Sequence, residues 1–234
     1  SQRLDFTDRK QGGNPLTATL IKNLSRHVGE EVEIRGWLFN KRSSGKIAFL
    51  IVRDGSGLVQ GVLLKANEAA FAAAEKLTQE SSLRLRGTVR AEARAAGGYE
   101  IDVTEVYPVS IAGEYPISLK EHGVEFLADR RHLWIRTPKQ AAILRIRSEI
   151  EFALREFFYR NDFVLADAPI ITPAACEGTT NLFEIDYHGD KGYLSQSGQL
   201  YNEATAAALG RIYCFGPTFR AEKSKTRRHL LDFW

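Results

Sequence analysis

The residues best suited to chemistry lie near the end of the sequence, where an arginine and a glutamate share one strand-like run. This run, Phe219–Glu222, precedes a short basic loop over 223–227 and a second strand-like run, Arg228–Trp234. Burying an arginine or a glutamate in a strand costs free energy unless each charge has a partner. The pattern therefore indicates that Arg220 and Glu222 serve binding or catalysis.

A second pattern lies in the first half, between Ile34 and Arg53, where no residue is acidic. Cations attract phosphates, and an aromatic ring stacks on an unpaired base with about 1–3 kcal/mol per base. The cluster favours binding of a nucleic acid with splayed bases, with Phe49 as the best stacking candidate. A solvated barrel face with core aromatics is the alternative. The basic and aromatic residues of the cluster are Arg35, Trp37, Phe39, Lys41, Arg42, Lys46, Phe49 and Arg53.

The elements that position this cluster follow a period of two, which predicts strands. An alanine-rich helix over 67–77, capped by Asn67, falls between the third and fourth strands. Three strands, a helix and two strands is the order of an OB-fold barrel, whose exposed face commonly binds oligonucleotides, and a generic small barrel is the alternative. Val32, Ile34 and Leu38 should face inward. We expect the strands over 31–40, 47–53, 58–65, 82–94 and 99–109.

The second half changes to a helical period after a linker over 107–126 that is rich in proline and glycine. Thr137-Pro138 begins a helix that runs to about Arg160, with apolar residues at helical spacing. Strands then alternate with one more helix, over 200–209 and stopped by Gly210, which favours an α+β fold built on an antiparallel sheet. We expect these strands over 163–171, 182–187, 192–195, 211–222 and 228–234.

The second half resembles the class II aminoacyl-tRNA synthetases. The runs Phe219–Glu222 and Arg228–Trp234 are similar to the second signature motif of that family, and the helix ending near Arg160, followed by Phe163–Pro169, is similar to the first. Glu177–Thr180 and Gln196–Tyr201 resemble the amino-acid pocket of the aspartyl/asparaginyl branch. That branch also carries an N-terminal OB domain that reads the anticodon, so the resemblance covers nearly the whole chain from about Ser25.

The resemblance implies an α+β fold class with an all-β N-terminal domain. We expect an N-terminal extension over 1–24, an OB-fold anticodon-binding domain over 25–108, a hinge over 109–126 and a class II catalytic domain over 127–234. Nothing up to Trp234 resembles the third family motif, and the sequence contains no methionine. We therefore expect the first part of a longer protein, with an incomplete catalytic domain. A synthetase fragment that binds tRNA without catalysis is an alternative.

By this resemblance, Arg220 is the catalytic residue that grips the α-phosphate of ATP, and Glu222 binds the adenine amino group. Arg228, His229 and Leu230 complete the ATP site, and Mg²⁺ bridges the outer phosphates without a metal ligand from this sequence. The enzyme would join a substrate carboxylate to the α-phosphate and then transfer the aminoacyl group to tRNA. The family's first motif builds a homodimer, and the tRNA-binding residues would be Arg35, Trp37, Arg42, Lys46 and Phe49.

The resemblance assigns five residues to the amino-acid pocket: Glu177, Gln196, Gln199, Asn202 and Glu203. Glu177 would hold the substrate α-ammonium. Where aspartyl enzymes carry a lysine that faces the substrate carboxylate, this sequence has Asn202, and Gly198 replaces their proline. A neutral side chain leaves a buried carboxylate unbalanced, whereas a carboxamide needs an acceptor such as Glu203. Asparagine is therefore favoured as substrate, with a non-discriminating aspartyl enzyme, or a surface role for Asn202 and Glu203, as alternatives.

Composition sets the remaining limits. The 234 residues are 44% hydrophobic and 26% charged, which excludes disordered, collagen-like and low-complexity classes. No apolar run approaches a membrane span, and the polar start Ser1–Asn14 indicates no signal peptide, so no membrane partner is expected. Cys176 and Cys214 lack metal-site spacing, which argues against zinc and against a disulfide framework. We expect a cytoplasmic protein.

Overall fold

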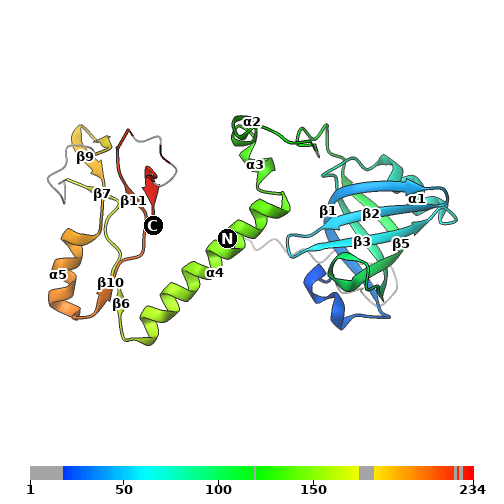
Figure 1. Ribbon diagram of the computed structural model, residues 1–234, viewed down its shortest axis with the longest axis horizontal. Helices are drawn as coiled ribbons and strands as arrows, with labels where there is room; N and C mark the ends of the chain where they lie inside the picture. Colours follow the sequence, from blue (N-terminus) through cyan, green and yellow to red (C-terminus); the bar gives the residue numbers. More distant parts are fainter. Residues whose placement is uncertain (1–17, 119, 174–181, 224–225, 227–228) are drawn as a thin grey trace. The chain divides into compact units, whose positions relative to one another are not determined.

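The alternating apolar residues of the first half close into a five-stranded barrel (Figure 1). The computed structural model describes residues 18–118, 120–173, 182–223, 226 and 229–234, which divide into one unit up to Leu127 and a second from Ala128. Around the barrel the strand order is β1-β2-β3-β5-β4, with β1 paired to β4. The predicted OB-like order is thus confirmed. The strands are β1 Glu31–Ser44, β2 Ile47–Arg53, β3 Leu58–Leu64, β4 Ser82–Ala91 and β5 Tyr99–Ser110.

The inward face of the barrel is the one that the alternation predicts. Val32, Ile34 and Leu38 are all buried, as are Leu50 on β2 and Leu85 on β4. The helix α1 (Glu68–Lys76) adds its alanines to this core. Its predicted cap is also present, because the side chain of Asn67 accepts a hydrogen bond from the backbone N–H of Ala70. The wall of the barrel is therefore rigid enough to hold outward side chains in fixed positions.

A short 3₁₀ helix, Ile21–Arg26, packs Ile21 and Leu24 against this core. The carboxylate of Asp54, in the β2–β3 turn, accepts the backbone N–H of Ile21 at 2.7 Å. The neighbouring residue Ala18 forms an isolated bridge with Glu33. Glu33 is only 2% exposed, although the alternation places it on the outer side of β1. A second 3₁₀ turn, Ala96–Gly98, joins β4 to β5.

The second unit contains the long predicted helix, α4, with the bounds Pro138–Arg160 and Pro138 in its first turn. Two short helices precede it, α2 (Val124–Ala128) and α3 (Arg131–Trp134), which the sequence pattern did not predict. On α4 the apolar side chains Ile146, Ile150 and Phe157 are 53–60% exposed within the described chain. None of the described helices combines the length and apolar character that a membrane span requires.

The strands of the second unit are shorter than predicted. The strand expected over 163–171 is only β6 (Val164–Leu165), followed by β7 (Ile171–Thr172), because Pro169 and Pro173 lack the N–H that a ladder needs. The run over 211–222 splits into β10 (Ile212–Tyr213) and β11 (Thr218–Phe219) around Gly216-Pro217. Of the last run, β12 covers only Asp232–Phe233. The expected hairpin is present as β8 (Glu184–Tyr187) and β9 (Asp190–Leu194).

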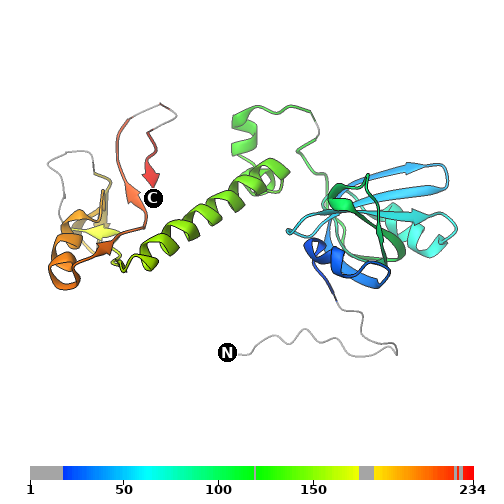
Figure 2. The same ribbon diagram turned by 60° about the horizontal axis from the view of Figure 1, so that its bottom comes forward.

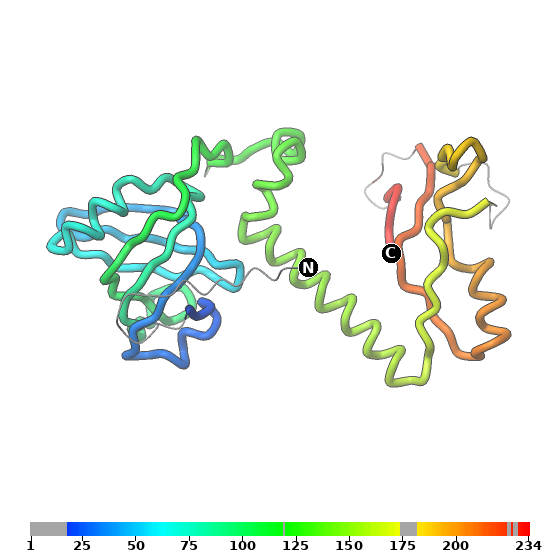
Figure 3. Tube along the Cα trace, turned by 180° about the vertical axis from the view of Figure 1, so that it is seen from behind, coloured from blue at the N-terminus to red at the C-terminus, as the bar shows by residue number. Residues whose placement is uncertain are grey.

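These strands form three small sheets: β7-β9-β8, β11-β12 and β10-β6. The first two are antiparallel, as expected, but β6 and β10 are parallel. The segment after α4 thus runs alongside the segment after α5 (Gln199–Leu209), which Figures 2 and 3 show in yellow-green beside orange. Two sequence-distant segments, each with residues of interest, are therefore neighbours.

Candidate functional site

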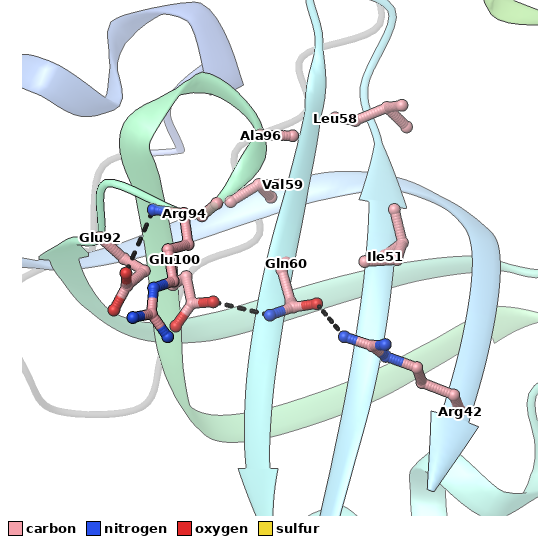
Figure 4. Close-up of a pocket in the computed structure, with 10 residues that line it drawn as sticks. Arg42, Ile51, Leu58, Val59, Gln60, Glu92, Arg94, Ala96 and Glu100 are labelled. Atoms are coloured by element: carbon pink, nitrogen blue, oxygen red, sulfur yellow. Dashed lines mark hydrogen bonds between the residues drawn. The ribbon is translucent and has the colours of Figure 1, made fainter.

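The first group of candidate residues lies on the outer wall of the barrel, over β1, β2 and β3. Arg42 and Phe49 are cross-strand partners, and the Arg42 guanidinium lies 4.6 Å from the centre of the Phe49 ring. Arg42 Nη2 also donates to Gln60 Oε1 at 3.2 Å (Figure 4). The Arg42 guanidinium and the Phe49 ring thus form a pair that presents a positive charge and an aromatic face to an incoming base or phosphate.

Beside this pair is a cavity of about 690 Å³, drawn in Figure 4. Gln60 Nε2 donates to Glu100 Oε1 at 2.6 Å, and Arg90 Nη2 donates to Glu100 Oε2 at 2.7 Å. Glu100 is almost fully buried, and it fixes the Gln60 amide with its oxygen toward Arg42. Sequence reasoning missed Gln60 and Glu100. Gln60 is the only polar side chain in the run Leu58–Leu64, and this was the signal that could have found it.

The other predicted barrel residues are not all in this group. Arg35 lies seven residues before Arg42 on β1, about 23 Å along an extended strand. Its Nε donates to Glu33 Oε1 at 2.7 Å. The Trp37 ring, 41% exposed, faces the Arg53 guanidinium at 5.1 Å. The structure therefore brings Arg42 and Phe49 together and places Arg35 and Trp37 on another part of the wall.

Two lysines of the cluster have different surroundings. Lys46 is exposed in the hairpin turn between β1 and β2. Lys41 points to the end of α1, where its Nζ donates to the carbonyl oxygens of Ala74, Glu75 and Leu77 at 2.9–3.0 Å. Burial lowers the pKa of Lys41, against the opposing effect of the nearby Glu75 carboxylate. Lys41 therefore caps a helix, while its neighbour Arg42 faces outward.

Glu33 pairs with two arginines, Arg35 on β1 and Arg86 on β4. Burial by itself would raise the pKa of Glu33, but hydrogen bonds from Arg35 and Arg86 outweigh it, so the pKa lies below its ordinary value. Arg86 Nε donates to Glu33 Oε2 at 2.8 Å, and Arg86 also pairs with Glu105 at 3.1 Å. This network joins β1, β4 and β5, and its role is structural.

The second group of candidate residues meets at Ser195 in the second unit. The buried Ser195 donates its backbone N–H to Ile170 O, and its own carbonyl accepts the N–H of Phe219, both at 2.9 Å. Ser195 thus joins Ile170, the residue after the run that resembles the first family motif, to the strand β11. Gln196 directly follows Ser195, and Arg220 directly follows Phe219. The residues predicted for the amino acid therefore begin next to those predicted for ATP.

The residues predicted for ATP lie between the strands β11 and β12 in the sequence. Phe219 pairs with Asp232, and Arg220 N donates to Leu231 O at 2.8 Å. The Arg220 guanidinium lies 5.2 Å from the Phe233 ring and is exposed, so it is supported from one side and free to meet an anion on the other. The three further residues of this group, Glu222, His229 and Leu230, are exposed.

The residues predicted for the amino acid are found at the start of α5 and just before it. Gln196 is buried, whereas Gln199 and Glu203 are exposed on the first turns of α5. Gln199 Nε2 donates to Glu203 Oε1 at 3.3 Å, which holds the carboxylate in place. The side-chain oxygen of Asn202 is buried and has no hydrogen-bond partner among the described residues. An unpaired buried acceptor costs free energy and is satisfied when a ligand donates to it.

Two predicted residues, Glu177 and Arg228, lie outside the described residues, as does Cys176. Among the side chains that the structure does describe, no group of three His, Cys, Asp or Glu residues could hold a metal ion.

Comparison with known proteins gives the relation of both units to established families. Residues 32–109 match the family model "OB-fold nucleic acid binding domain", and residues 123–234 match "tRNA synthetases class II (D, K and N)". An asparagine--tRNA ligase of Pelotomaculum thermopropionicum is 74% identical over 217 residues, which is 92% of this chain and 50% of that protein. This chain is similar to the asparaginyl-tRNA synthetases of class II along nearly its whole length.

Two further relatives show the same similarity. An asparagine--tRNA ligase of Thermus thermophilus is 55% identical over 218 residues, covering 92% of this chain and 50% of that protein. The crystal structure of the asparaginyl-tRNA synthetase from Pyrococcus horikoshii, complexed with asparaginyl-adenylate, aligns with a TM-score of 0.87 at 38% identity, over 93% of this chain and 51% of that one. The chain spans about half the length of the curated relatives that it matches. The predicted fold class, OB barrel followed by the start of a class II synthetase domain, is confirmed.

Proposed function

We propose that the protein to which this chain belongs ligates asparagine to tRNA(Asn), with ATP, through an asparaginyl-adenylate. The observation that carries the proposal is the 74% identity, along nearly all of this chain, to a protein named asparagine--tRNA ligase. The polar group around Ser195 supports it, because the segments proposed for ATP and for the amino acid are hydrogen-bonded to each other there. Adenylate formation needs these two substrates side by side.

In the first step, an oxygen of the asparagine carboxylate attacks the α-phosphorus of ATP. The new oxygen–phosphorus bond forms as the bond to the pyrophosphate breaks. Arg220 is assigned to the α-phosphate, where its guanidinium stabilises the charge that develops on the phosphoryl oxygens. Glu222 is assigned to the adenine amino group, and Arg228, His229 and Leu230 to the rest of ATP. In the second step, the aminoacyl group moves to the 3′ end of the tRNA, and AMP leaves.

Selectivity for the carboxamide is assigned to Asn202 and Glu203. Asn202 Oδ1 is an acceptor without a partner among the described residues, and Glu203 is an acceptor held by Gln199. A substrate carboxamide donates through its NH₂ group, whereas a carboxylate has no proton to donate and would meet negative charge. Gln196 is assigned a hydrogen bond to the amino acid, and Glu177 the substrate α-ammonium.

We infer that the barrel binds the anticodon arm of the tRNA, through the outer wall on which Arg42 and Phe49 lie. Lys46 would add a phosphate contact, and Arg35 and Trp37 would extend the contact along β1. Mg²⁺ accompanies ATP in this proposal, on the strength of the family resemblance alone.

We further infer that the protein is a cytoplasmic homodimer. The exposed apolar side chains of α4, Ile146, Ile150 and Phe157 among them, support a subunit contact there, because a face of this kind is normally covered. Sedimentation of the full-length protein should give twice the monomer mass, and a monomer at micromolar concentration would contradict this inference.

The proposed function is tested by aminoacylation with the full-length protein, labelled amino acids and purified tRNAs. We expect asparagine to be attached to tRNA(Asn), with no transfer of aspartate to either tRNA(Asn) or tRNA(Asp). Transfer of aspartate to both tRNAs would instead identify a non-discriminating aspartyl enzyme. Binding of tRNA without any transfer would identify a non-catalytic binding protein.

A further inference from the structure

The bend between β9 and α5 contains a contact that only a glycine permits. A Cβ at Gly198 would lie 2.8 Å from Cys214 Sγ, 3.2 Å from Cys214 Cβ and 3.1 Å from Asn202 Nδ2. The first of these distances is shorter than real Cβ contacts. Any other residue at this position would therefore push against Cys214 on one side and Asn202 on the other.

The reason for glycine here is space and not backbone conformation. Gly198 has φ −83° and ψ −1°, which every residue adopts. Its carbonyl accepts the N–H of Asn202 at 2.9 Å and so begins the first turn of α5. Because Ser195 is bonded to both neighbouring segments, the bend cannot move away freely from Cys214. Added volume at Gly198 must therefore displace the start of α5.

The start of α5 carries three residues assigned to the amino acid. The buried Asn202 oxygen has no partner among the described residues, and the amide nitrogen of the same side chain adjoins Gly198. Gln199 and Glu203 are one residue and five residues beyond Gly198, and they are bonded to each other. A shift at the bend would move these acceptors together, while Arg220, which directly follows β11, is held by the β11–β12 pairing and by its own hydrogen bond to Leu231 O.

We propose that Gly198 and Cys214 are a matched pair of positioning residues, which set the depth of the amino-acid pocket through their close contact. Cys214 Sγ fills the space that a side chain at position 198 would need, and in this way it places Asn202. The inference rests on the proposed function, since it concerns the same pocket, and it adds two residues that contact no substrate.

The test is steady-state ATP–pyrophosphate exchange by the full-length protein and three variants: Gly198→Ala, Cys214→Ala and the double variant. We expect Gly198→Ala to raise the KM for asparagine by about tenfold or more, since small misplacements near reacting groups have large effects on rate and binding. The KM for ATP should stay within about twofold. In the Cys214→Ala background, the Gly198→Ala change should cost much less, because the sulfur is gone.

Gly216→Ala is the matched control, because Gly216 lies on the same segment as Cys214 and a Cβ there would meet nothing within 4 Å. It should exchange like the unaltered protein. Should Gly198→Ala fail to fold, as judged by its melting temperature, Cys214→Val fills the same contact from the opposite side and should raise the KM for asparagine alone.

Three results would overturn the inference: an unchanged KM in Gly198→Ala, an equal loss with and without Cys214, or an equal rise in the KM for ATP. The unaltered protein gives the separate test of the proposed function, because it must exchange with asparagine. If it exchanges with aspartate instead, the proposed function fails, and the same variants are compared on the KM for aspartate.

Discussion

Lys41 and Arg42 are adjacent cations with opposite surroundings, so replacing each of them by methionine should give opposite phenotypes. Lys41 Nζ donates three hydrogen bonds to carbonyls at the end of α1, and burial lowers its pKa. Arg42 is exposed and contacts Phe49 and Gln60. Lys41→Met should therefore destabilise the barrel and spare RNA binding, whereas Arg42→Met should do the reverse.

The magnitude for Lys41→Met follows from these contacts. A hydrogen bond from a charged donor contributes about 1.5–3 kcal/mol net. Three bonds that share one partly buried ammonium do not add up, because the same charge is desolvated only once. We therefore expect the free energy of unfolding to fall by about 1–3 kcal/mol. For a domain of about 60–100 residues, this lowers the melting temperature by about 4–8 °C per kcal/mol.

Arg42→Met should change the free energy of unfolding only a little, since an exposed cation–π contact contributes about 0.5–1 kcal/mol. In RNA binding we expect an affinity loss of about tenfold and a salt dependence reduced by about one phosphate contact. The assays are calorimetric melting and filter binding of tRNA at several salt concentrations, at a temperature where both variants are folded. Equal losses of tRNA affinity in Lys41→Met and Arg42→Met would refute the distinction.

Three further changes have separate outcomes. Phe49→Ala should weaken tRNA binding and leave asparagine adenylation nearly intact, and equal loss of both activities would point to misfolding instead. Arg220→Ala should abolish ATP–pyrophosphate exchange without lowering the melting temperature of the barrel, and retained exchange would remove Arg220 from the phosphate. The arginine partners of Glu33 lower its pKa in the folded state below the ordinary value of 4.5. The ionised Glu33 therefore stabilises the fold fully at pH values above 4.5, and this stabilisation is lost as the pH falls through the folded pKa. Acid unfolding of Glu33→Gln should therefore show a weaker loss of stability below pH 4.5 than the unaltered protein, and parallel curves would contradict this.

The barrel could be predicted from the sequence because each of its strands is long and alternates over a closed core. Val32, Ile34 and Leu38 are buried as expected, and β2 has the predicted bounds. The alternation cannot tell which outward residues are covered by other elements. Glu33 is buried: its backbone forms a bridge with Ala18, and its carboxylate pairs with Arg35 and Arg86.

The same limit applies to the cations of the outer wall. Their types alone suggest one RNA-binding cluster, but the direction of a side chain depends on its neighbours in space. Lys41 lies against the end of α1, which is more than thirty residues away in sequence, and Trp37 is covered in part by Arg53. Gln60 was missed because its partner Glu100 comes from a strand forty residues further on.

In the second unit, the order of elements from α4 onward was predicted, but their lengths were not. Short strands form their hydrogen bonds with partners that are far away in the sequence. The local pattern of apolar residues therefore does not predict where such strands begin and end. The contact of Gly198 with Cys214 is likewise invisible in the sequence, where it is only a glycine and a distant cysteine. The pairing of β6 with β10 brings their two segments together.

The most direct test of the proposed function is ATP–pyrophosphate exchange by the full-length protein, with asparagine and aspartate compared at equal concentrations. A pocket that has the neutral Asn202 and the acceptor Glu203 should support exchange with asparagine and leave exchange with aspartate at background. Exchange with aspartate as the amino acid, together with no exchange when asparagine replaces it, would contradict the proposal.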